Sequence, residues 1–327
     1  MIRGAADSLL DLAVLPGYSR VGWQARRAMG LLDPVDADLT GRVCVITGAT
    51  GGLGLEAAGQ LAALGASVVL VGRSEERLAA AHDLVAARAA TGEGQVETVV
   101  IDLSSLESVR HGAGVILEFH PEIHALVNNA GVLLDSRQES ADGFELSFAT
   151  NVLGPFLLTE LLLPALEAGA DTSGAPSRIV SVSSGGMYTT GVDLADLQSE
   201  AGGSWSGSTV YARTKRMQLM LTEVWARRLA AAGVTANAMH PGWADTPGVQ
   251  DSLPAFHRVM GPVLRSPAEG ADTITWLVAD PQAGSESGAF WHDRRRRPTS
   301  LLPGTRPEPG DAERLYVECR RLSGLDG

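Results

Sequence analysis

The sequence predicts one α/β domain, a doubly wound parallel sheet with helices on both faces. Apolar runs of strand length alternate with longer Ala-, Leu- and Glu-rich stretches, which is typical of parallel strands joined by helices. A glycine-rich turn directly follows the first apolar run and opens a helical stretch. The chain of 327 residues, 45% hydrophobic and 20% charged, is long enough for one large domain of this kind.

Two helical stretches are expected before the first strand, within residues 1–40. One spans residues 5–15 and ends at Pro16-Gly17, and the other spans residues 19–32 and ends before Asp33-Pro34. Both carry apolar stripes. We interpret residues 1–40 as an N-terminal helical extension packed on the main domain. An element at a membrane surface or at the substrate entrance is the alternative.

Residues 41–292 form the predicted main domain. Its strands are expected at Val43–Ile46, Val68–Val71, Val96–Ile101, Ala125–Val127, Ile179–Val182, Val234–Met239 and Ala289–His292. Helices are expected at residues 75–90 and 222–232, and a loop at residues 202–208.

Residues 293–327 are expected to form a C-terminal arm whose last helix spans residues 311–322. Four consecutive arginines, Arg294–Arg297, begin this arm. They are expected to form a solvated turn, and contact with an acidic lipid or a partner is the alternative.

The composition excludes several classes of protein. The 26 basic and 38 acidic residues give a net charge of −12, which a nucleic acid would repel. Cys44 and Cys319 offer no disulfide framework, which suits a reducing cytoplasm, and the seven histidines show no metal-ligand spacing, so no metal is expected. The acidic residues within the first apolar stretch argue against a signal peptide. The apolar segment Val152–Ala168 is short for a membrane span. We therefore expect a cytoplasmic protein.

The glycine-rich turn has the composition of a phosphate site. Glycines let the backbone approach a pyrophosphate, and the helix N-terminus supplies unpaired N–H groups. A tight turn without a ligand is the alternative. The predicted cofactor-binding residues here are Thr47, Gly48, Thr50, Gly51, Gly52, Leu53 and Gly54. This placement predicts a dinucleotide-binding sheet of the Rossmann type.

The pattern TGxxxGxG of this turn resembles the fingerprint of the short-chain dehydrogenases/reductases. Further motifs resemble that family in the same order over about residues 41–250: Asp102-Leu103, Asn128-Asn129-Ala130-Gly131, the set Asn151, Ser184, Tyr211 and Lys215, and Pro241-Gly242 with Thr246. The stretches 183–187, 196–200 and 240–249 resemble the member-twelve subgroup of this family, near its retinol-dehydrogenase-like branch. The resemblance implies an adenine contact at Asp102 and Leu103, nucleotide contacts at Asn129, Ala130 and Gly131, and nicotinamide-side contacts at Pro241, Gly242 and Thr246. It also implies the catalytic residues Asn151, Ser184, Tyr211 and Lys215.

The end of the second strand indicates which dinucleotide is bound. An acid about 20 residues past the glycines would select NAD(H). Here the residues are Val71-Gly72-Arg73-Ser74, and the guanidinium of Arg73 suits a 2′-phosphate. We therefore expect NADP(H) and keep NAD(H) as the alternative. Arg73 as a surface arginine that caps a helix is the second interpretation.

Tyr211 and Lys215 lie four residues apart, on one face of the expected helix. A phenol with a pKa of about 10 is a poor base near pH 7, and a cation within about 4–6 Å lowers such a pKa by about 1–3 units. Lys215 is the only lysine among the 26 basic residues, a second reason to expect a specific role. Lys215 is expected to bind the nicotinamide ribose in addition to lowering the pKa of Tyr211. Tyr211 and Lys215 are therefore both predicted to bind the cofactor as well.

Ser184 follows a strand at the edge where such sheets bind ligands, and it is expected to hydrogen-bond the substrate oxygen. Ser183 and a plain turn serine are the alternatives. By resemblance, Asn151 holds a water in a proton relay, and a helix-capping or helix-kinking residue is the alternative. The 27-residue interval between Ser184 and Tyr211 contains Met187, Tyr188 and Trp205, which border the substrate pocket or only pack on the surface.

These observations predict an NADP(H)-dependent alcohol dehydrogenase or carbonyl reductase with residues 41–292 as its catalytic domain. Its partners are then a small carbonyl or alcohol substrate, apolar in character, and no nucleic acid; a homo-oligomer is left open. A non-catalytic NADP(H)-binding scaffold or regulator is the second hypothesis. Sugar-nucleotide epimerase or dehydratase chemistry is the third, and the glycine spacing and the lack of a large C-terminal substrate domain disfavour it.

Overall fold

A computed structural model of the chain describes residues 7, 14–89, 94–201 and 204–326. One eight-stranded sheet runs through its centre in the order β3-β2-β1-β4-β5-β6-β7-β8. The first seven strands are parallel, and β8 pairs antiparallel with β7. The strands are β1 (Val43–Thr47), β2 (Ser67–Gly72), β3 (Val96–Val100), β4 (Ala125–Asn128), β5 (Ser177–Val182), β6 (Val234–Met239), β7 (Phe290–His292) and β8 (Arg295–Arg297). The strand order reverses between β1 and β4, and at such a switch point an open sheet forms its ligand crevice.

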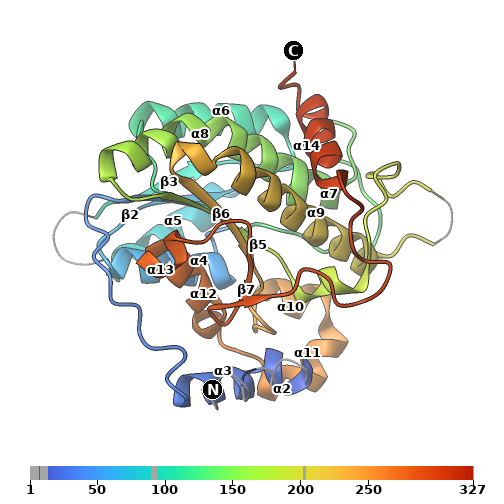
Figure 1. Cartoon of the computed structure of the whole chain (residues 1–327), viewed down its shortest axis with the longest axis horizontal. Helices are drawn as coiled ribbons and strands as arrows, with labels where there is room; N and C mark the ends of the chain where they lie inside the picture. The colour runs from blue at the N-terminus through green and yellow to red at the C-terminus, as the bar shows by residue number, and fades with distance from the viewer. Residues whose placement is uncertain (1–6, 8–13, 90–93, 202–203, 327) are drawn as a thin grey trace.

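Helices cover both faces of the sheet, as the sequence predicts (Figure 1). The α-helices are α2 (Val14–Tyr18), α3 (Arg20–Ala28), α4 (Gly52–Ala63), α5 (Glu75–Ala86), α6 (Leu106–Phe119), α7 (Leu146–Phe148), α8 (Gly154–Ser173), α9 (Gly207–Arg228), α10 (Pro247–Ser252), α11 (Pro254–Met260), α12 (Pro267–Ala279), α13 (Pro281–Gly284) and α14 (Asp311–Leu322). Val45 of β1 packs into the core under α6, α8, α9 and α14. Its neighbours Cys44 and Ile46 pack into the core under α4, α5 and α12. Both faces of β1 are buried, which explains its unbroken apolar run.

The predicted strands are confirmed to within one or two residues, and the predicted last helix is α14. The expected helix at 222–232 is wrong in extent because it is the end of the longer α9, followed by a 3-10 turn at Ala230–Ala232. The expected helix at 75–90 ends at Ala86. Of the expected loop at 202–208, Gly207 already begins α9, capped by the Ser206 hydroxyl, and residues 202–203 lie outside the described residues.

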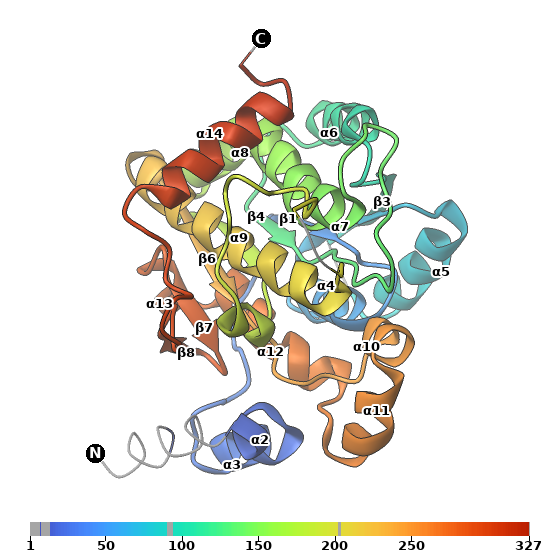
Figure 2. The ribbon, with the colours of Figure 1, turned by 90° about the vertical axis from the view of Figure 1, so that its right-hand side faces the viewer.

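The N-terminal extension packs on the main domain beside α11, as Figure 2 shows. Arg26 of α3 is fully buried and forms ion pairs with Asp7 (2.7 Å) and with Asp293 (2.6 Å), which follows β7. This confirms the packed interpretation of the described part of residues 1–40. The expected helix end at Pro16-Gly17 is wrong, because both residues lie inside α2, where the proline occupies the first turn. Residues 5, 6 and 8–13 of the expected first helix lie outside the described residues.

The expectation of a solvated turn at Arg294–Arg297 is wrong for three of the four residues, since only Arg294 lies in the turn between β7 and β8. Arg295–Arg297 form β8, and Arg294 forms an ion pair with Asp272 at 2.6 Å. Arg296 pairs with Glu286 and Arg297 with Asp7. Arg295 also lies 3.8 Å from Asp7, so three acids from three other segments of the chain offset this run of like charges. The division of the chain at residues 40 and 292 stays a prediction, although β8 continues the sheet past the second boundary.

The helical stretch Leu146–Ser173 is longer than the apolar segment noted in the sequence. Its 28 residues have a mean hydropathy of 1.5 in the most apolar window, enough by length and composition to cross a membrane. Of that window, 72% is buried within the protein. The stretch supplies Phe156, Leu157 and Leu158 to the core, which accounts for its apolar composition.

Candidate active site

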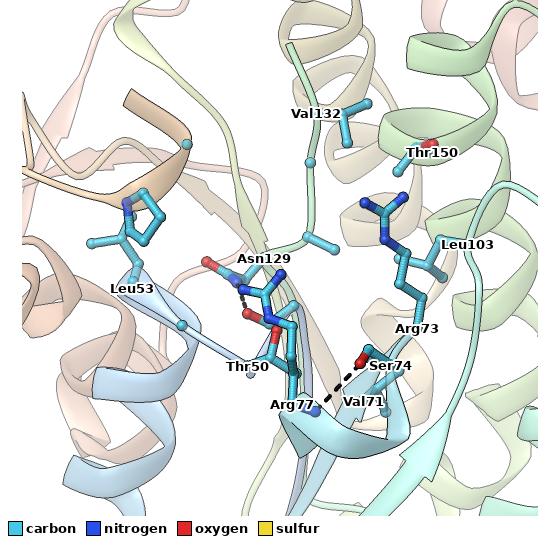
Figure 3. Close-up of a pocket in the computed structure, with 18 of the residues that line it drawn as sticks. Thr50, Leu53, Val71, Arg73, Ser74, Arg77, Leu103, Asn129, Val132 and Thr150 are labelled. Atoms are coloured by element: carbon cyan, nitrogen blue, oxygen red, sulfur yellow. Dashed lines mark hydrogen bonds between the residues drawn. The ribbon is translucent and has the colours of Figure 1, made fainter. Parts of the chain in front are cut away.

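A cavity of about 330 Å³ lies where β1, β2 and β4 end (Figure 3). Its volume falls within the range of ligand pockets in proteins. Its walls come from the glycine-rich turn, the start of α5, the segments after β3 and β4, and the start of α10. Twelve predicted cofactor residues line it: Gly48, Thr50, Gly51, Gly52, Leu53, Arg73, Asp102, Leu103, Asn129, Ala130, Gly131 and Thr246.

The glycine-rich turn has the geometry of a phosphate cradle. Gly48 and Gly52 adopt φ values of +67° and +55°, which favour glycine. A Cβ at Gly54 would overlap the carbonyl oxygen of Gly48, so only glycine allows α4 to start this close to β1. The twelve-residue α4 begins at Gly52 without a side-chain cap at Gly51, which leaves the N–H groups of its first turn for a ligand. The turn therefore fits the pyrophosphate of a dinucleotide.

Thr47 and Asn129 join the ends of β1 and β4 behind this turn. The Thr47 hydroxyl accepts hydrogen bonds from the backbone N–H groups of Asn129 (3.0 Å) and Ala130 (3.1 Å). The Asn129 amide donates back to the Thr47 carbonyl at 2.8 Å. Thr47 and Gly54 do not line the cavity, so the structure places them in support of the turn.

Two arginines, not one, lie near the end of β2: Arg73 directly follows the strand, and Arg77 lies in the first turn of α5. Arg73 and Arg77 both line the cavity, and Figure 3 shows their guanidinium groups reaching in from the start of α5. The Ser74 hydroxyl caps α5 by accepting from the Arg77 N–H at 3.3 Å, so Arg73 is not the capping residue. A Cβ at Gly72 would lie 2.8 Å from Cγ2 of Thr50, so the position of an NAD-selecting acid has no room for a side chain. Sequence reasoning missed Arg77; its signal was the spacing of one helical turn from Arg73.

Tyr211 and Lys215 lie on α9, as expected, beside Ser184 after β5. The Ser184 hydroxyl lies close enough to the Tyr211 phenol to affect its pKa. Lys215 Nζ lies 5.4 Å from the Tyr211 ring centroid and donates to the Val182 carbonyl at 2.8 Å. Ser183 donates instead to the Lys215 carbonyl at 2.8 Å, so it braces α9 and is turned from the site.

The pKa values of this pair differ from the sequence-based expectation. Burial raises the pKa of Tyr211 to about 12, and the nearby Ser184 hydroxyl opposes this rise. Burial lowers the pKa of Lys215 to about 7. In the cofactor-free protein, the cost of removing the Tyr211 phenolate and the Lys215 ammonium from water therefore outweighs the attraction between them. The expected low phenol pKa requires a further positive charge beside Tyr211.

Asn151 lies in a π-helical turn, Ala149–Leu153, that leads into α8. Its side chain pairs with the backbone of Val132, accepting at 2.7 Å and donating at 2.9 Å, and it also donates to the Thr214 hydroxyl at 3.0 Å. Single π-helical turns inside helices are frequent at functional sites. This one turns Asn151 toward the segment that follows β4.

Gln218 is buried one helical turn beyond Lys215 and links Lys215 to Asn151. It accepts from Lys215 Nζ at 3.1 Å and donates to the Asn151 carbonyl at 2.7 Å. Sequence reasoning missed Gln218, because an i,i+3 glutamine on an amphipathic helix carries no distinct signal.

The catalytic set adjoins the cavity through Gly131. A Cβ at Gly131 would lie 3.1 Å from Lys215 Nζ and 3.4 Å from Asn151 Oδ1. Gly131 itself lines the cavity, as does Thr150 next to Asn151. Lys215 and Asn151 therefore meet the cavity at one end.

The predicted nicotinamide-side residues divide into two groups. Thr246 lines the cavity and its hydroxyl caps α10. Pro241 and Gly242 do not line it. The Pro241 carbonyl accepts from Arg265 at 3.2 Å, and Gly242, with φ +73°, lies against Arg265 and the Tyr18 carbonyl. Among the described residues, no group of three or more His, Cys, Asp or Glu side chains is placed to hold a metal ion.

Comparisons with known proteins agree with this geometry. The family model for short chain dehydrogenases matches residues 42–255. A dehydrogenase/reductase SDR family member 12 from Bos taurus is 37% identical, covering 94% of this chain and 94% of its own length. A polyprenol dehydrogenase from Mus musculus is 38% identical over 90% of this chain and 87% of its own. A crystal structure of an uncharacterized protein from Mycobacterium paratuberculosis superposes with a TM-score of 0.68 at 29% identity, covering 88% of this chain and 95% of that one.

The match covers more than half of the chain and includes the glycine-rich turn, Ser184, Tyr211 and Lys215. Relatives above 30% identity extend the likeness over nearly the whole length. This chain is an oxidoreductase acting on CH–OH and C=O groups with a nicotinamide cofactor, and it belongs to the short-chain dehydrogenase/reductase family.

Proposed function

We propose that this protein is an NADP(H)-dependent alcohol dehydrogenase or carbonyl reductase for an apolar substrate. The observation that carries this proposal is the junction at Gly131. Gly131 lines the cavity at the glycine-rich turn, and it also lies against Lys215 Nζ and Asn151 Oδ1. A cofactor held by the glycine-rich turn would thus present its reactive end to the proton-transfer residues.

Arg73 and Arg77 support NADP(H) over NAD(H). Both line the cavity, and guanidinium groups match the geometry of a phosphate. The absence of a side chain at Gly72 leaves no carboxylate there to bind a ribose 2′-hydroxyl or to repel a 2′-phosphate. The ribose phosphate would then lie between Arg73 and Arg77.

In the proposed mechanism, Tyr211 exchanges a proton with the substrate oxygen while Ser184 holds that oxygen by a hydrogen bond. The nicotinamide, when bound, supplies or accepts the hydride. Lys215 uses two of its protons on Val182 and Gln218, which leaves the third for the face toward Gly131. Asn151 holds that face in register through its two bonds to Val132.

A cluster of aromatic side chains lies near Ser184, which supports an apolar substrate. Tyr18 of α2 packs edge-on against His240 (4.6 Å between ring centroids) and Trp243 (6.0 Å), and Trp243 packs against Phe256 of α11 (5.4 Å). A Cβ at Gly185, next to Ser184, would lie 3.4 Å from the Tyr18 ring. The N-terminal extension thus contributes a wall close to Ser184.

The segment expected to border the substrate pocket has a different role. Met187 and Tyr188 are buried in a core cluster with Leu219, Ala238 and Phe290. This core packing differs from both interpretations given by the sequence, the pocket border and the surface, and we assign the substrate wall to Tyr18, Trp243 and Phe256.

The proposal is tested by following absorbance of the reduced cofactor with a series of aldehydes and ketones of increasing chain length. We expect turnover with NADPH, a higher kcat/KM for longer apolar chains, and loss of turnover in Tyr211→Phe with NADPH binding retained. Binding of NADPH without turnover of any carbonyl or alcohol would favour the scaffold hypothesis.

We also propose a cytoplasmic location, because Cys44 and Cys319 are both free, buried thiols. Imaging of a tagged protein in the native cell tests this. Accumulation at a membrane or outside the cell would contradict it.

A further inference from the structure

A second cavity, of about 540 Å³, lies at the other edge of the sheet, where β1, β4 and β5 begin. None of its lining residues borders the cofactor cavity. Figure 2 shows α13, which forms part of its wall, at the left of the view and α10 at the right. The lining combines apolar side chains, among them Leu39, Cys44 and Val278, with two arginines and a histidine.

Arg178 is the unusual member of this lining. It is 8% exposed, yet within the described part of the chain its guanidinium makes no hydrogen bond and no ion pair, and its Nη1 is buried without a partner. A Cβ at Gly284 would overlap this guanidinium, so a glycine makes room for it. The buried Arg26 and Arg265, in contrast, both pair with Asp293. A buried charge without a partner is costly, and an anion would offset that cost.

Two further donors face the same cavity. Arg42 is partly buried and lines the cavity. Burial lowers the pKa of Arg178, and the positive charge of the nearby Arg42 lowers it further. His124 accepts the Val43 N–H on Nδ1 at 3.0 Å, so its Nε2 carries the proton and is a donor. Burial and the charge of Arg42 lower the pKa of His124, which keeps it neutral near pH 7.

The acids around this group do not neutralise it. Asp280 attracts Arg178 but forms no ion pair with it among the described residues; its carboxylate caps α13 through the Gln282 N–H at 2.7 Å. Asp36 and Asp38 are exposed at the rim. Glu122, which faces His124, accepts a hydrogen bond from Thr172.

We propose that this cavity is a second binding site, for a small organic carboxylate with an apolar body. The carboxylate would meet the guanidinium groups of Arg42 and Arg178 and the Nε2–H of His124. The apolar body would lie along Leu39, Ala125 and Val278. Guanidinium pairs match carboxylates, and the cavity has the volume of a small-molecule site. The apolar lining selects this ligand class over a bare inorganic anion.

The experiment is calorimetric titration of the full chain, at constant ionic strength, with octanoate, octanamide and inorganic phosphate. We expect octanoate to bind at one site and octanamide and phosphate to bind at least about tenfold more weakly. Arg178→Met keeps the length of the side chain without its charge and is expected to weaken octanoate binding by about tenfold or more. Arg42→Gln is expected to do the same. Arg306→Gln, which removes an exposed arginine of the C-terminal arm, is the matched control and should bind octanoate normally.

Circular dichroism and NADPH affinity, measured on every variant, report on folding and on the cofactor cavity at the other edge. Octanoate binding that is unchanged in both Arg178→Met and Arg42→Gln would overturn the proposal, because the ligand would then lie elsewhere, for example at the aromatic wall. No octanoate binding, or phosphate binding as tight as octanoate, would also overturn it. If Arg178→Met does not fold, Arg42→Gln decides, since Arg42 is more exposed.

Discussion

Lys215 Nζ donates a hydrogen bond to Gln218 Oε1 at 3.1 Å, and Gln218 Nε2 donates one to the Asn151 carbonyl at 2.7 Å. Lys215 is 2% exposed, and its ammonium lies against Gly131, where even a Cβ would come within 3.1 Å of it. The space around Lys215 is therefore matched to a compact ammonium. This explains why one basic position in a chain of arginines is a lysine.

Lys215→Arg should fold but lose at least about 100-fold in turnover, within the range of general acid–base assistance. A guanidinium is longer, planar and fixed in its donor directions, so it does not fit between Gly131, Val182 and Gln218. Steady-state kinetics checks the loss, with circular dichroism and melting temperature as the control. Near-full turnover in the variant would show that the tight geometry around Nζ is not used in the reaction.

The low pKa of Lys215 predicts a pH-dependent stability of the cofactor-free protein. Its pKa is about 7 in the folded chain and about 10.4 in an unfolded one, so the unfolded state binds more protons between these values. The free energy of unfolding should therefore rise with pH from about 7 to 10 on account of this group. Above about pH 10, Tyr211 acts in the opposite direction, because its folded pKa is raised to about 12.

Urea denaturation of the natural protein and of Lys215→Met at several pH values isolates the lysine contribution. The difference in free energy of unfolding between the two should grow in favour of the natural protein from pH 7 to pH 10. A constant difference would mean that Lys215 keeps an ordinary pKa.

Arg73→Ala and Arg77→Ala should each weaken NADPH binding by about 10- to 150-fold, the equivalent of one lost charge-assisted hydrogen bond. NADH binding should change little, because the proposed contact is to the 2′-phosphate. Introducing an acid at Gly72 is a poor test, since its Cβ would lie 2.8 Å from Cγ2 of Thr50. Fluorescence titration with both cofactors gives the ratio, with Arg306→Ala as the control. Equal loss for both cofactors would point to contacts with the shared part of the dinucleotide.

Tyr18→Ala should raise KM for a long apolar carbonyl by about tenfold and leave KM for a short one unchanged. The ring lies beside Gly185 and Trp243, at the proposed substrate wall. Deleting the extension is less informative, because it removes Arg26, a buried partner of Asp293, and breaking a buried ion pair costs about 3–5 kcal/mol. Arg27→Ala, on the exposed side of α3, is the matched control. A parallel change in both KM values would remove Tyr18 from the substrate wall.

The sequence by itself determined the sheet, the glycine-rich turn and the placement of Tyr211 and Lys215 on one helix face. These features depend on local periodicity and on residues whose backbone demands are specific, such as Gly48 and Gly52 at positive φ. The buried faces of β1 also follow directly from its continuous apolar run. Interactions among residues close together in the chain set these features, so the sequence alone is enough to predict them.

Only the tertiary structure decided how distant segments meet. Arg294–Arg297 looked like a solvated turn because their acids, Asp7, Asp272 and Glu286, lie elsewhere in the chain. Gln218 contacts Asn151, and Arg77 lines the cofactor cavity, only because folding brings distant segments together. The pKa values of Tyr211 and Lys215 moved away from each other, because burial disfavours both charged forms and no sequence pattern records how much water remains around a side chain.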